Sequence, residues 1–500
     1  MDLKYKKSPF TFVWITATVI FCLLFTFALI PGAAAQGNLQ TPSGSGNTQG
    51  QVRNYTNIMQ NVYDFIVRNY VEEVDPRVIF EGAMNGMFGA LEDPYSTFLS
   101  ESDMKDLNDT TQGSFGGVGL NIIKAVAPRP DGKPMWVEVV SPIEDTPGWR
   151  AGISPGDFIV KINDEPTENI TMDEVLAMLR GTPGESVNLV IRRGEKMEFP
   201  VTLVRAVIEV PTVKHALIGK TGYLKLLTFT PMSAERARDA INEFKDKNYN
   251  SLILDLRNNY GGRLDAAVEV SNLFLDGGLV VRTRSRIASE NRDFNARKST
   301  LVAPDIPVIV LINKGSASAS EIVAGALKDR GRAYLVGENT FGKGSVQQVY
   351  PLSGTGFKIT TARYFTPSDV NIDKVGIPPD REVKFPEYTE ADAEKMNVLI
   401  NANKIPEFAE QNPKATPAQI ETFAQGLERE YKLNLSLIKR LIRNELNRTT
   451  IAPVYDLEYD VQLQEAMKIF ESKTYQNLMK DSKTLKQMQE EAEKNLVLAS

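Results

Sequence analysis

The most promising nucleophile in the sequence is a serine within a run of small residues. Residues 313–321 read Asn-Lys-Gly-Ser-Ala-Ser-Ala-Ser-Glu and join a predicted buried strand at 307–312 to a predicted helix at 321–328. The first N–H groups of a helix are unpaired and carry partial positive charge, so an oxyanion formed beside Ser318 would meet ready donors. The stretch from Ser318 to Glu321 is also an S-x-x-E capping box, and taken alone Ser318 is better explained as an N-cap.

A second glycine loop contains a lysine that could serve as the base. Residues 337–345 read GENTFGKGS and follow a predicted strand at 333–336. The loop fits the start of a P-loop, but Gly344 stands where Ser or Thr would hold Mg²⁺, and residues 346–351 alternate like a strand. Phosphate binding by a P-loop needs a helix N-terminus at that point. The sequence therefore disfavours nucleotide binding, and a dyad of Ser318 and Lys343 becomes the leading interpretation.

The scarce residues point in the same direction. The chain has one histidine, His215, which lies in no motif, and one cysteine, Cys22, which lies in an apolar N-terminal run. A zinc site of the H-E-x-x-H kind needs two histidines, so we expect no such metal site and no cofactor. A lysine is a base only when neutral, and lowering its pKa from about 10.4 to about 7–8 requires about 4 kcal/mol, which desolvation can supply.

The elements that must position both loops follow an α/β pattern between residues 206 and 387. Predicted buried strands at 252–256, 307–312 and 333–336 alternate with predicted helices at 266–275 and 321–328. Strand ends on one side of such a sheet converge on a single site. The strand at 252–256 runs into Asp-Leu-Arg-Asn-Asn-Tyr-Gly-Gly at 255–262, which brings two glycines to the same edge.

Residues 113–205 contain short predicted strands, glycine turns and a predicted helix at 172–179, and they resemble a PDZ domain. The resemblance rests on FGGVGL at 115–120, on AGISPGDFI at 151–159 and on LRG at 179–181. In such a module, backbone N–H groups capture a terminal carboxylate while the peptide adds as a strand to an open edge. The peptide-binding residues implied are Phe115, Gly116, Gly117, Val118, Gly119 and Leu120.

The two ends of the chain differ in character from its middle. Lysines precede an apolar run at 9–30 and an A-x-A site at 33–35, which predicts that residues 1–35 are a signal peptide or an uncleaved membrane anchor. Residues 36–52 are predicted to be a flexible linker and 53–112 a helical segment. Residues 388–500 read as polar helices suited to docking or to homo-oligomer formation. The net charge of −6 gives no indication of nucleic-acid binding.

The chain as a whole resembles the carboxyl-terminal processing proteases, also called tail-specific proteases. The match runs from about residue 53 to 386 and rests on seven motifs in order: 93–96 (DPYS), the PDZ motifs, 255–262, 313–321, 340–347, 361–368 and 376–380. The resemblance implies a multidomain α/β (α+β) protein, with a crotonase- or ClpP-like core at 206–387 and a PDZ domain at 113–205. Helical segments flank them on the N- and C-terminal sides.

The same resemblance implies roles for individual residues. Ser318 would be the nucleophile, Lys343 the general base and Gln347 the residue that positions the lysine. The oxyanion hole would be formed by Ala319 and by Gly261 or Gly262. Two departures from the family pattern, Asp369 and residues 372–374, are expected to touch a surface turn and not the dyad.

The expected activity is that of an exported serine endopeptidase, periplasmic or otherwise extracytoplasmic. If residues 9–30 are not cleaved off, they would hold it at the inner membrane. It would grip polypeptides with apolar C-termini through the PDZ domain and cleave them through an acyl-enzyme. The alternative that stays open is a catalytically silent PDZ adaptor or scaffold in the cell envelope. An adaptor, however, has no use for Lys343.

Overall fold

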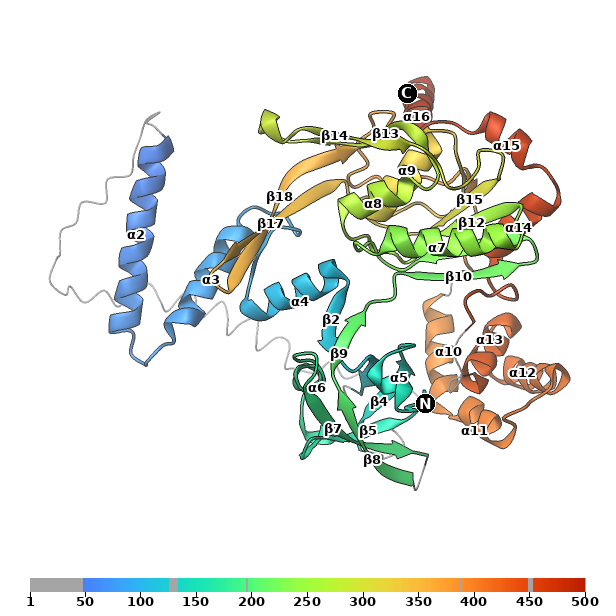
Figure 1. Cartoon of the computed structure of the whole chain (residues 1–500), viewed down its shortest axis with the longest axis horizontal. Coiled ribbons are helices and arrows are strands. Elements are labelled where there is room, and N and C mark those ends of the chain that lie inside the picture. The colour runs from blue at the N-terminus through green and yellow to red at the C-terminus, as the bar shows by residue number, and fades with distance from the viewer. Residues whose placement is uncertain (1–47, 126–133, 195–196, 387–388, 448–452, 500) are drawn as a thin grey trace, which may run out of the picture. The chain divides into compact units, whose positions relative to one another are not determined.

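The computed structural model describes residues 48–125, 134–194, 197–386, 389–447 and 453–499 (Figure 1). The chain divides into two compact units, one up to Phe80 and the other from Glu81 onward. Helix α2 (Thr48–Asn69) belongs to the first unit, and α3 (Pro76–Gly89) crosses the division. The predicted leader or anchor at 1–35 lies outside the described residues. Within the ranges described, no helix is long and apolar enough to cross a membrane.

A six-stranded sheet forms the centre of the second unit. Its order is β10 (Val213–Ile218), β11 (Thr221–Leu226), β12 (Ser251–Asp255), β15 (Val308–Ile312), β16 (Tyr334–Gly337) and β19 (Arg381–Glu382). Only β10 and β11 pair antiparallel; the other pairs are parallel. The predicted strands at 252–256, 307–312 and 333–336 are confirmed to within one residue at each end. Both turns that carry the candidate dyad leave this sheet at the carboxyl ends of its parallel strands.

Alternate residues of β12 enter two different hydrophobic cores, because a strand is pleated. Leu252 and Leu254 face the core shared with α7 (Ser233–Asp246), α8 (Leu264–Ser271) and α9 (Ala319–Asp329). Ile253 faces the opposite core, which contains Leu463 and Ala466 of α14 (Val461–Glu471). Helices therefore cover both faces of the sheet, and one of the two layers comes from the C-terminal region.

A second sheet lies beside the Lys343 loop. Its order is β1 (Thr97–Leu99), β18 (Thr355–Phe365), β13 (Asp276–Arg284) and β14 (Arg292–Lys298), with β17 (Ser345–Leu352) also paired to β18. Helix α4 (Glu101–Gln112) follows β1. The prediction that residues 53–112 form a helical segment is wrong at β1, because the turn at 93–96 ends the helical pattern and the chain then pairs with β18.

The PDZ-like segment has its own sheet and its own core. The sheet order is β3 (Leu120–Lys124), β4 (Val137–Pro142), β5 (Phe158–Ile162), β7 (Ser186–Arg193) and β8 (Met197–Val204), with β6 (Glu165–Pro166) on β5. Helix α5 (Pro147–Arg150) and helix α6 (Met172–Leu179) complete it, and α6 has the bounds predicted from the sequence. A ribbon of β2 (Ser114–Gly117) and β9 (Ala206–Glu209) joins its two ends.

The C-terminal region is helical, as predicted. Four helices enclose a separate core: α10 (Glu390–Asn401), α11 (Lys404–Gln411), α12 (Pro417–Tyr431) and α13 (Leu435–Leu446). Helix α14 then covers the central sheet and is followed by α15 (Tyr475–Asp481) and α16 (Leu485–Ala499).

Candidate functional site

Ser318 occupies the turn between β15 and α9 in a backbone conformation that L-residues rarely adopt. Its φ is 56° and its ψ is −113°. Such a conformation costs on the order of 1–3 kcal/mol and persists only where the surroundings impose it. The two flanking serines do so, since Ser316 Oγ donates to Leu256 O at 2.9 Å and Ser320 Oγ donates to Asn259 O at 2.8 Å. The Ser318 turn is thus bonded on both sides to the turn that follows β12.

The buried carboxylate of Glu321 joins the Ser318 turn to the Lys343 loop. One half of the predicted capping box is formed, because the Ser318 N–H donates to Glu321 Oε2 at 2.8 Å, while the Glu321 N–H donates to the carbonyl oxygen of Ser318 at 2.9 Å. The same carboxylate accepts the N–H groups of Gly342 at 2.7 Å and Lys343 at 2.9 Å, and the hydroxyl of Thr340 at 2.5 Å. Burial raises the pKa of Glu321, and these hydrogen bonds oppose that rise. One side chain therefore fixes the main chains of Ser318 and Lys343 relative to each other.

Tyr364 of β18 makes a second connection between the same two loops. Its buried hydroxyl donates a hydrogen bond to the carbonyl oxygen of Lys343. The same hydroxyl also points toward the carbonyl oxygen of Ser318, which lies 3.2 Å away. Burial raises the pKa of the Tyr364 hydroxyl well above its usual value, so it stays a proton donor. The sequence placed both loops at one sheet edge, and Glu321 and Tyr364 are the side chains that bring them together.

The Lys343 side chain is half-buried, and its ammonium lies over an aromatic ring. Its Nζ is 4.6 Å from the ring centroid of Tyr95, a geometry in which a cation is attracted to the ring face. Burial lowers the pKa of Lys343 and the charge of Lys358 lowers it further, whereas Asp93 and Glu321 raise it. The net direction is downward, which is the direction that a general base requires.

A tight turn holds that ring beside the lysine. The Tyr95 N–H donates to Asp93 Oδ1 at 3.0 Å, and Ser96 Oγ donates to Asp93 Oδ2 at 2.6 Å. Ser96 Oγ also accepts the N–H of Thr360 in β18 at 3.0 Å, which fastens the turn to the second sheet. The sequence identified residues 93–96 as a family motif. It did not predict that Tyr95 contacts Lys343, because the contact depends on pairing with a strand 264 residues away.

Gly261 lies against the Ser318 turn and Gly262 lies against Phe229, and a side chain would fit at neither position. A Cβ added to Gly261, whose φ is +101°, would lie 2.8 Å from Ser318 Cβ and 2.9 Å from Ala319 N. The Gly261 N–H already donates to Asn259 Oδ1 at 2.9 Å. Gly262 pairs with Phe229 in an isolated parallel β-bridge. The two hydrogen bonds of this bridge run from the Phe229 N–H to Gly261 O and from the Arg263 N–H to Phe229 O, so neither uses the N–H of Gly262.

Gln347 lies in β17 with its amide directed to two hydroxyls. Its Nε2 donates to Ser345 Oγ at 2.9 Å and to Thr360 Oγ1 at 3.1 Å. A role in positioning Lys343 stays a prediction.

The expectation that residues 372–374 touch only a surface turn is wrong. The Gly344 N–H donates to Asp373 Oδ1 at 3.1 Å, and the Lys374 N–H donates to Gly342 O at 2.7 Å. A Cβ added to Gly344 would lie 2.6 Å from Asp373 N, and one added to Gly342 would lie 2.9 Å from the backbone nitrogens of Val375 and Gly376. The absence of side chains at these two glycines therefore lets residues 373–376 pack directly against the Lys343 loop.

The predicted peptide-binding residues of the PDZ-like segment divide between two strands. Phe115, Gly116 and Gly117 lie in β2, and Leu120 begins β3. Val118 and Gly119 connect them, and Gly119 has a φ of +75° against the side chain of Thr146. Their role in binding peptide stays a prediction.

Among the described residues, no group of three or more His, Cys, Asp or Glu side chains could hold a metal ion.

Family models match three parts of the chain. That of peptidase family S41 matches residues 220–383, that of the PDZ domain matches 138–193, and that of the N-terminal domain of the activating protease CtpB matches 24–103.

Curated relatives are similar over most of their length. The carboxy-terminal-processing protease of Bartonella bacilliformis is 39% identical over 352 residues, which are 69% of this chain and 78% of the relative. The carboxy-terminal processing protease CtpB of Bacillus subtilis is 35% identical over 67% of this chain and 68% of its own. Among solved structures, a photosystem II D1 C-terminal processing protease is 30% identical, with a TM-score of 0.40 over 68% of this chain and 87% of its own.

Proposed function

Since this chain belongs to the carboxy-terminal processing proteases, serine-type peptidases of family S41 with a PDZ domain, we propose that it is an endopeptidase using a dyad of Ser318 and Lys343. The observation that carries the proposal is the carboxylate of Glu321, which accepts the N–H groups of both residues and so holds the two loops together. The lowered pKa of Lys343 supports its role as base, because burial favours the neutral amine.

The proposed reaction begins with transfer of a proton between the two residues. Neutral Lys343 Nζ takes the proton of Ser318 Oγ as that oxygen attacks the scissile carbonyl, and the carbonyl oxygen becomes an oxyanion. The Ala319 N–H, in the first turn of α9, donates to it. The second donor is assigned to Gly262, because the N–H of Gly261 is occupied by Asn259. When the tetrahedral intermediate collapses, the C–N bond breaks, the leaving amine takes the proton from Lys343 and an ester to Ser318 remains.

Hydrolysis of that ester repeats the same steps with water. Lys343 accepts a proton from a water molecule, whose oxygen attacks the ester carbonyl. The new intermediate expels Ser318 Oγ, which recovers its proton from Lys343. Cleavage of one peptide bond therefore consumes one water molecule, regenerates the dyad and needs no metal or cofactor.

The substrate and the compartment are part of the proposal. The PDZ-like segment would bind the free C-terminus of a polypeptide with an apolar last residue, and the peptidase would cut upstream of it. The layout of basic, apolar and small residues before position 36 supports export.

The test is the Ser318→Ala variant, assayed on an unfolded protein with an apolar C-terminus. We expect cleavage to be abolished while binding of a peptide with that C-terminus survives, and Lys343→Ala to be about as damaging because the two residues act as a unit. Continued cleavage by the alanine variant would show that Ser318 is not the nucleophile. Amidation of the substrate's C-terminus should slow the wild type, and equal rates on free and amidated substrates would refute capture by the PDZ domain.

A further inference from the structure

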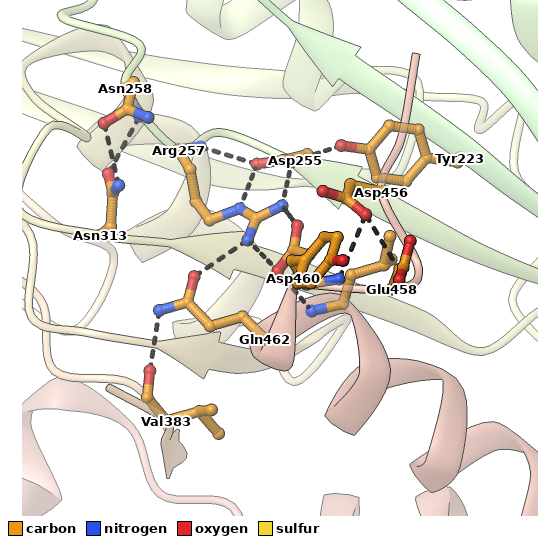
Figure 2. Close-up of polar contacts among 12 residues, drawn as sticks. Tyr223, Asp255, Arg257, Asn258, Asn313, Val383, Asp456, Glu458, Asp460 and Gln462 are labelled. Atoms are coloured by element: carbon orange, nitrogen blue, oxygen red, sulfur yellow. Dashed lines mark hydrogen bonds and ion pairs between the residues drawn. The ribbon is translucent and has the colours of Figure 1, made fainter. Parts of the chain in front are cut away.

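Arg257 connects the turn that carries Gly261 and Gly262 to a distant part of the chain. It lies two residues after the end of β12, and its side chain is only 6% exposed. A guanidinium has five N–H donors, and a buried one needs an acceptor for each. All five are bonded in Arg257, to Asp255 of β12 and to Asp460 and Gln462 of the C-terminal region (Figure 2).

The two carboxylates bind adjacent edges of the guanidinium, and Nη2 donates to both. Asp255 accepts from Nε at 2.9 Å and from Nη2 at 2.6 Å. Asp460 accepts from Nη1 at 2.7 Å and from Nη2 at 2.6 Å, and Gln462 Oε1 accepts the remaining Nη1 proton at 3.0 Å. Paired bonds of this kind fix orientation as well as distance. Figure 2 shows the planar group held between strand and helix.

Asp460 is itself firmly placed. It is the N-cap of α14, and its Oδ1 accepts the N–H of Leu463 at 3.0 Å. Gln462 is fully buried and donates through Nε2 to Val383 O at 2.7 Å, beside the end of β19. Helix α14 packs its apolar side against the central sheet. Arg257 therefore lies between two rigid elements.

The residues after Arg257 lead directly to the nucleophile. Asn258, in the left-handed region at φ 57°, exchanges two hydrogen bonds with Asn313, at 2.9 and 3.0 Å. Asn259 O accepts the N–H of Ala317 at 3.0 Å and the hydroxyl of Ser320 at 2.8 Å. The turn at 255–262 thus has one end fixed by the Arg257 ion pairs and the other held against the Ser318 turn.

We infer that Asp460 is a positioning residue for the oxyanion hole, which it holds in register with Ser318 through Arg257. The inference rests on the proposed function of the Ser318 turn. It assigns a catalytic contribution to α14, which lies outside the region matched by the peptidase family model at 220–383. Asp460 touches no reacting atom, and its effect is expected in the stabilisation of the tetrahedral intermediate, not in binding of the substrate.

The test is Asp460→Asn in the full chain, with a fluorogenic peptide that ends in an apolar residue. Asparagine is as good an N-cap as aspartate, so α14 keeps its start. The amide, however, offers one acceptor oxygen where the carboxylate offered two, which leaves one N–H of Arg257 unpaired. Because loss of a whole oxyanion-hole donor costs about 10²–10³-fold, we expect kcat to fall by about 10- to 100-fold with KM within about twofold of the wild type.

A matched control lies on the same helix. Glu465 pairs with Arg381 at 3.2 Å, so Glu465→Gln removes a charge from α14 without touching Arg257, and its kcat should equal that of the wild type. Affinity for a peptide boronate, which forms a tetrahedral adduct on serine, should fall in Asp460→Asn in parallel with kcat/KM. A role confined to folding would lower the melting temperature but would leave kcat per folded molecule and boronate affinity unchanged.

Two outcomes would overturn the inference: a kcat for Asp460→Asn within threefold of the wild type, or an equal loss in Glu465→Gln. If Asp460→Asn does not fold, Gln462→Leu removes a single acceptor from Arg257 and should lower kcat by about 3- to 10-fold, and an unchanged kcat would overturn the inference in the same way. Ser318→Ala, assayed in parallel, tests the proposed function separately from the inference about Asp460. If it is inactive while Asp460→Asn has wild-type kcat, only the inference about Asp460 fails.

Discussion

Replacing Gly261 by alanine should slow catalysis by about 30- to 100-fold and leave KM nearly unchanged. The new Cβ would lie 2.7 Å from Ala317 O, 2.8 Å from Ser318 Cβ and 2.9 Å from Ala319 N, whereas ordinary contact begins at 3.4 Å. The tightest contact must therefore open by 3.4 − 2.7 = 0.7 Å. These neighbours are backbone atoms and the first carbon of the nucleophile, so no flexible side chain can relieve the clash.

The size of the effect follows from that displacement. A misplacement of about 1 Å at a reacting group can cost about 100-fold in rate, and 0.7 Å is most of that distance. A loss of about 30- to 100-fold corresponds to about 2–3 kcal/mol of transition-state stabilisation. In the proposed function the PDZ-like segment holds the substrate's C-terminus and this turn does not, so the loss should fall on kcat.

The assay is steady-state cleavage of a fluorogenic peptide, with thermal unfolding measured in parallel. Gly184→Ala is the matched control, because Gly184 has a similar φ of +98° but no atom within 4 Å of an added Cβ. It imposes the backbone strain without the clash, and its kcat should stay within about twofold of the wild type. The reasoning would be refuted if Gly261→Ala kept kcat within threefold of the wild type, or if Gly184→Ala lost as much.

The other predictions concern the environment of the base. Only the neutral amine of Lys343 accepts a proton, so kcat/KM should rise with pH through its lowered pKa and then level off. Lys358→Gln removes a neighbouring positive charge, which should raise the pKa of Lys343 and move this rise to higher pH. An unchanged pH profile in this variant would contradict the assignment of Lys343 as the base. Tyr95→Phe should keep kcat, whereas Tyr95→Leu should lower kcat by about 10-fold. Because the aromatic ring stabilises the ammonium of Lys343, its loss in Tyr95→Leu should also move the rise of kcat/KM to lower pH. Equal rates for the two variants would argue against the contact between Tyr95 and Lys343. Glu321→Gln turns an amide group toward several N–H donors and should lower both kcat, by about 100-fold, and the melting temperature; wild-type kinetics would exclude the bridging role.

Local patterns were enough to predict the elements around the dyad. A short apolar run followed by small residues and an S-x-x-E box placed Ser318 at the start of a helix, although the helix begins at Ala319 and not at residue 321, because the cap precedes it. The alternation of strands and glycine loops placed Lys343 at the same sheet edge. Both features depend on neighbours in sequence, which a single chain displays directly.

The supporting residues could not be predicted in the same way, because their partners are distant in sequence. Tyr95 reaches Lys343 only through pairing of β1 with β18, and Asp460 reaches Arg257 across 203 residues. Asp373 appeared to belong to a surface turn because its acceptor role toward Gly344 depends on how two loops meet. Aspartate and tyrosine are common in turns and helix caps, so residue type alone gives no signal of such contacts.

The Arg257 guanidinium receives its two carboxylates at very different times during synthesis of the chain. Asp255 leaves the ribosome two residues before Arg257, and Asp460 follows 203 residues after it. At about 5–20 residues per second, that gap corresponds to roughly 10–40 s. Ser318 and Lys343 are both made within the gap, so a nascent chain contains both members of the proposed dyad while one edge of the arginine still has no partner. The Arg257 ion pairs therefore cannot be completed before the start of α14 has been synthesised.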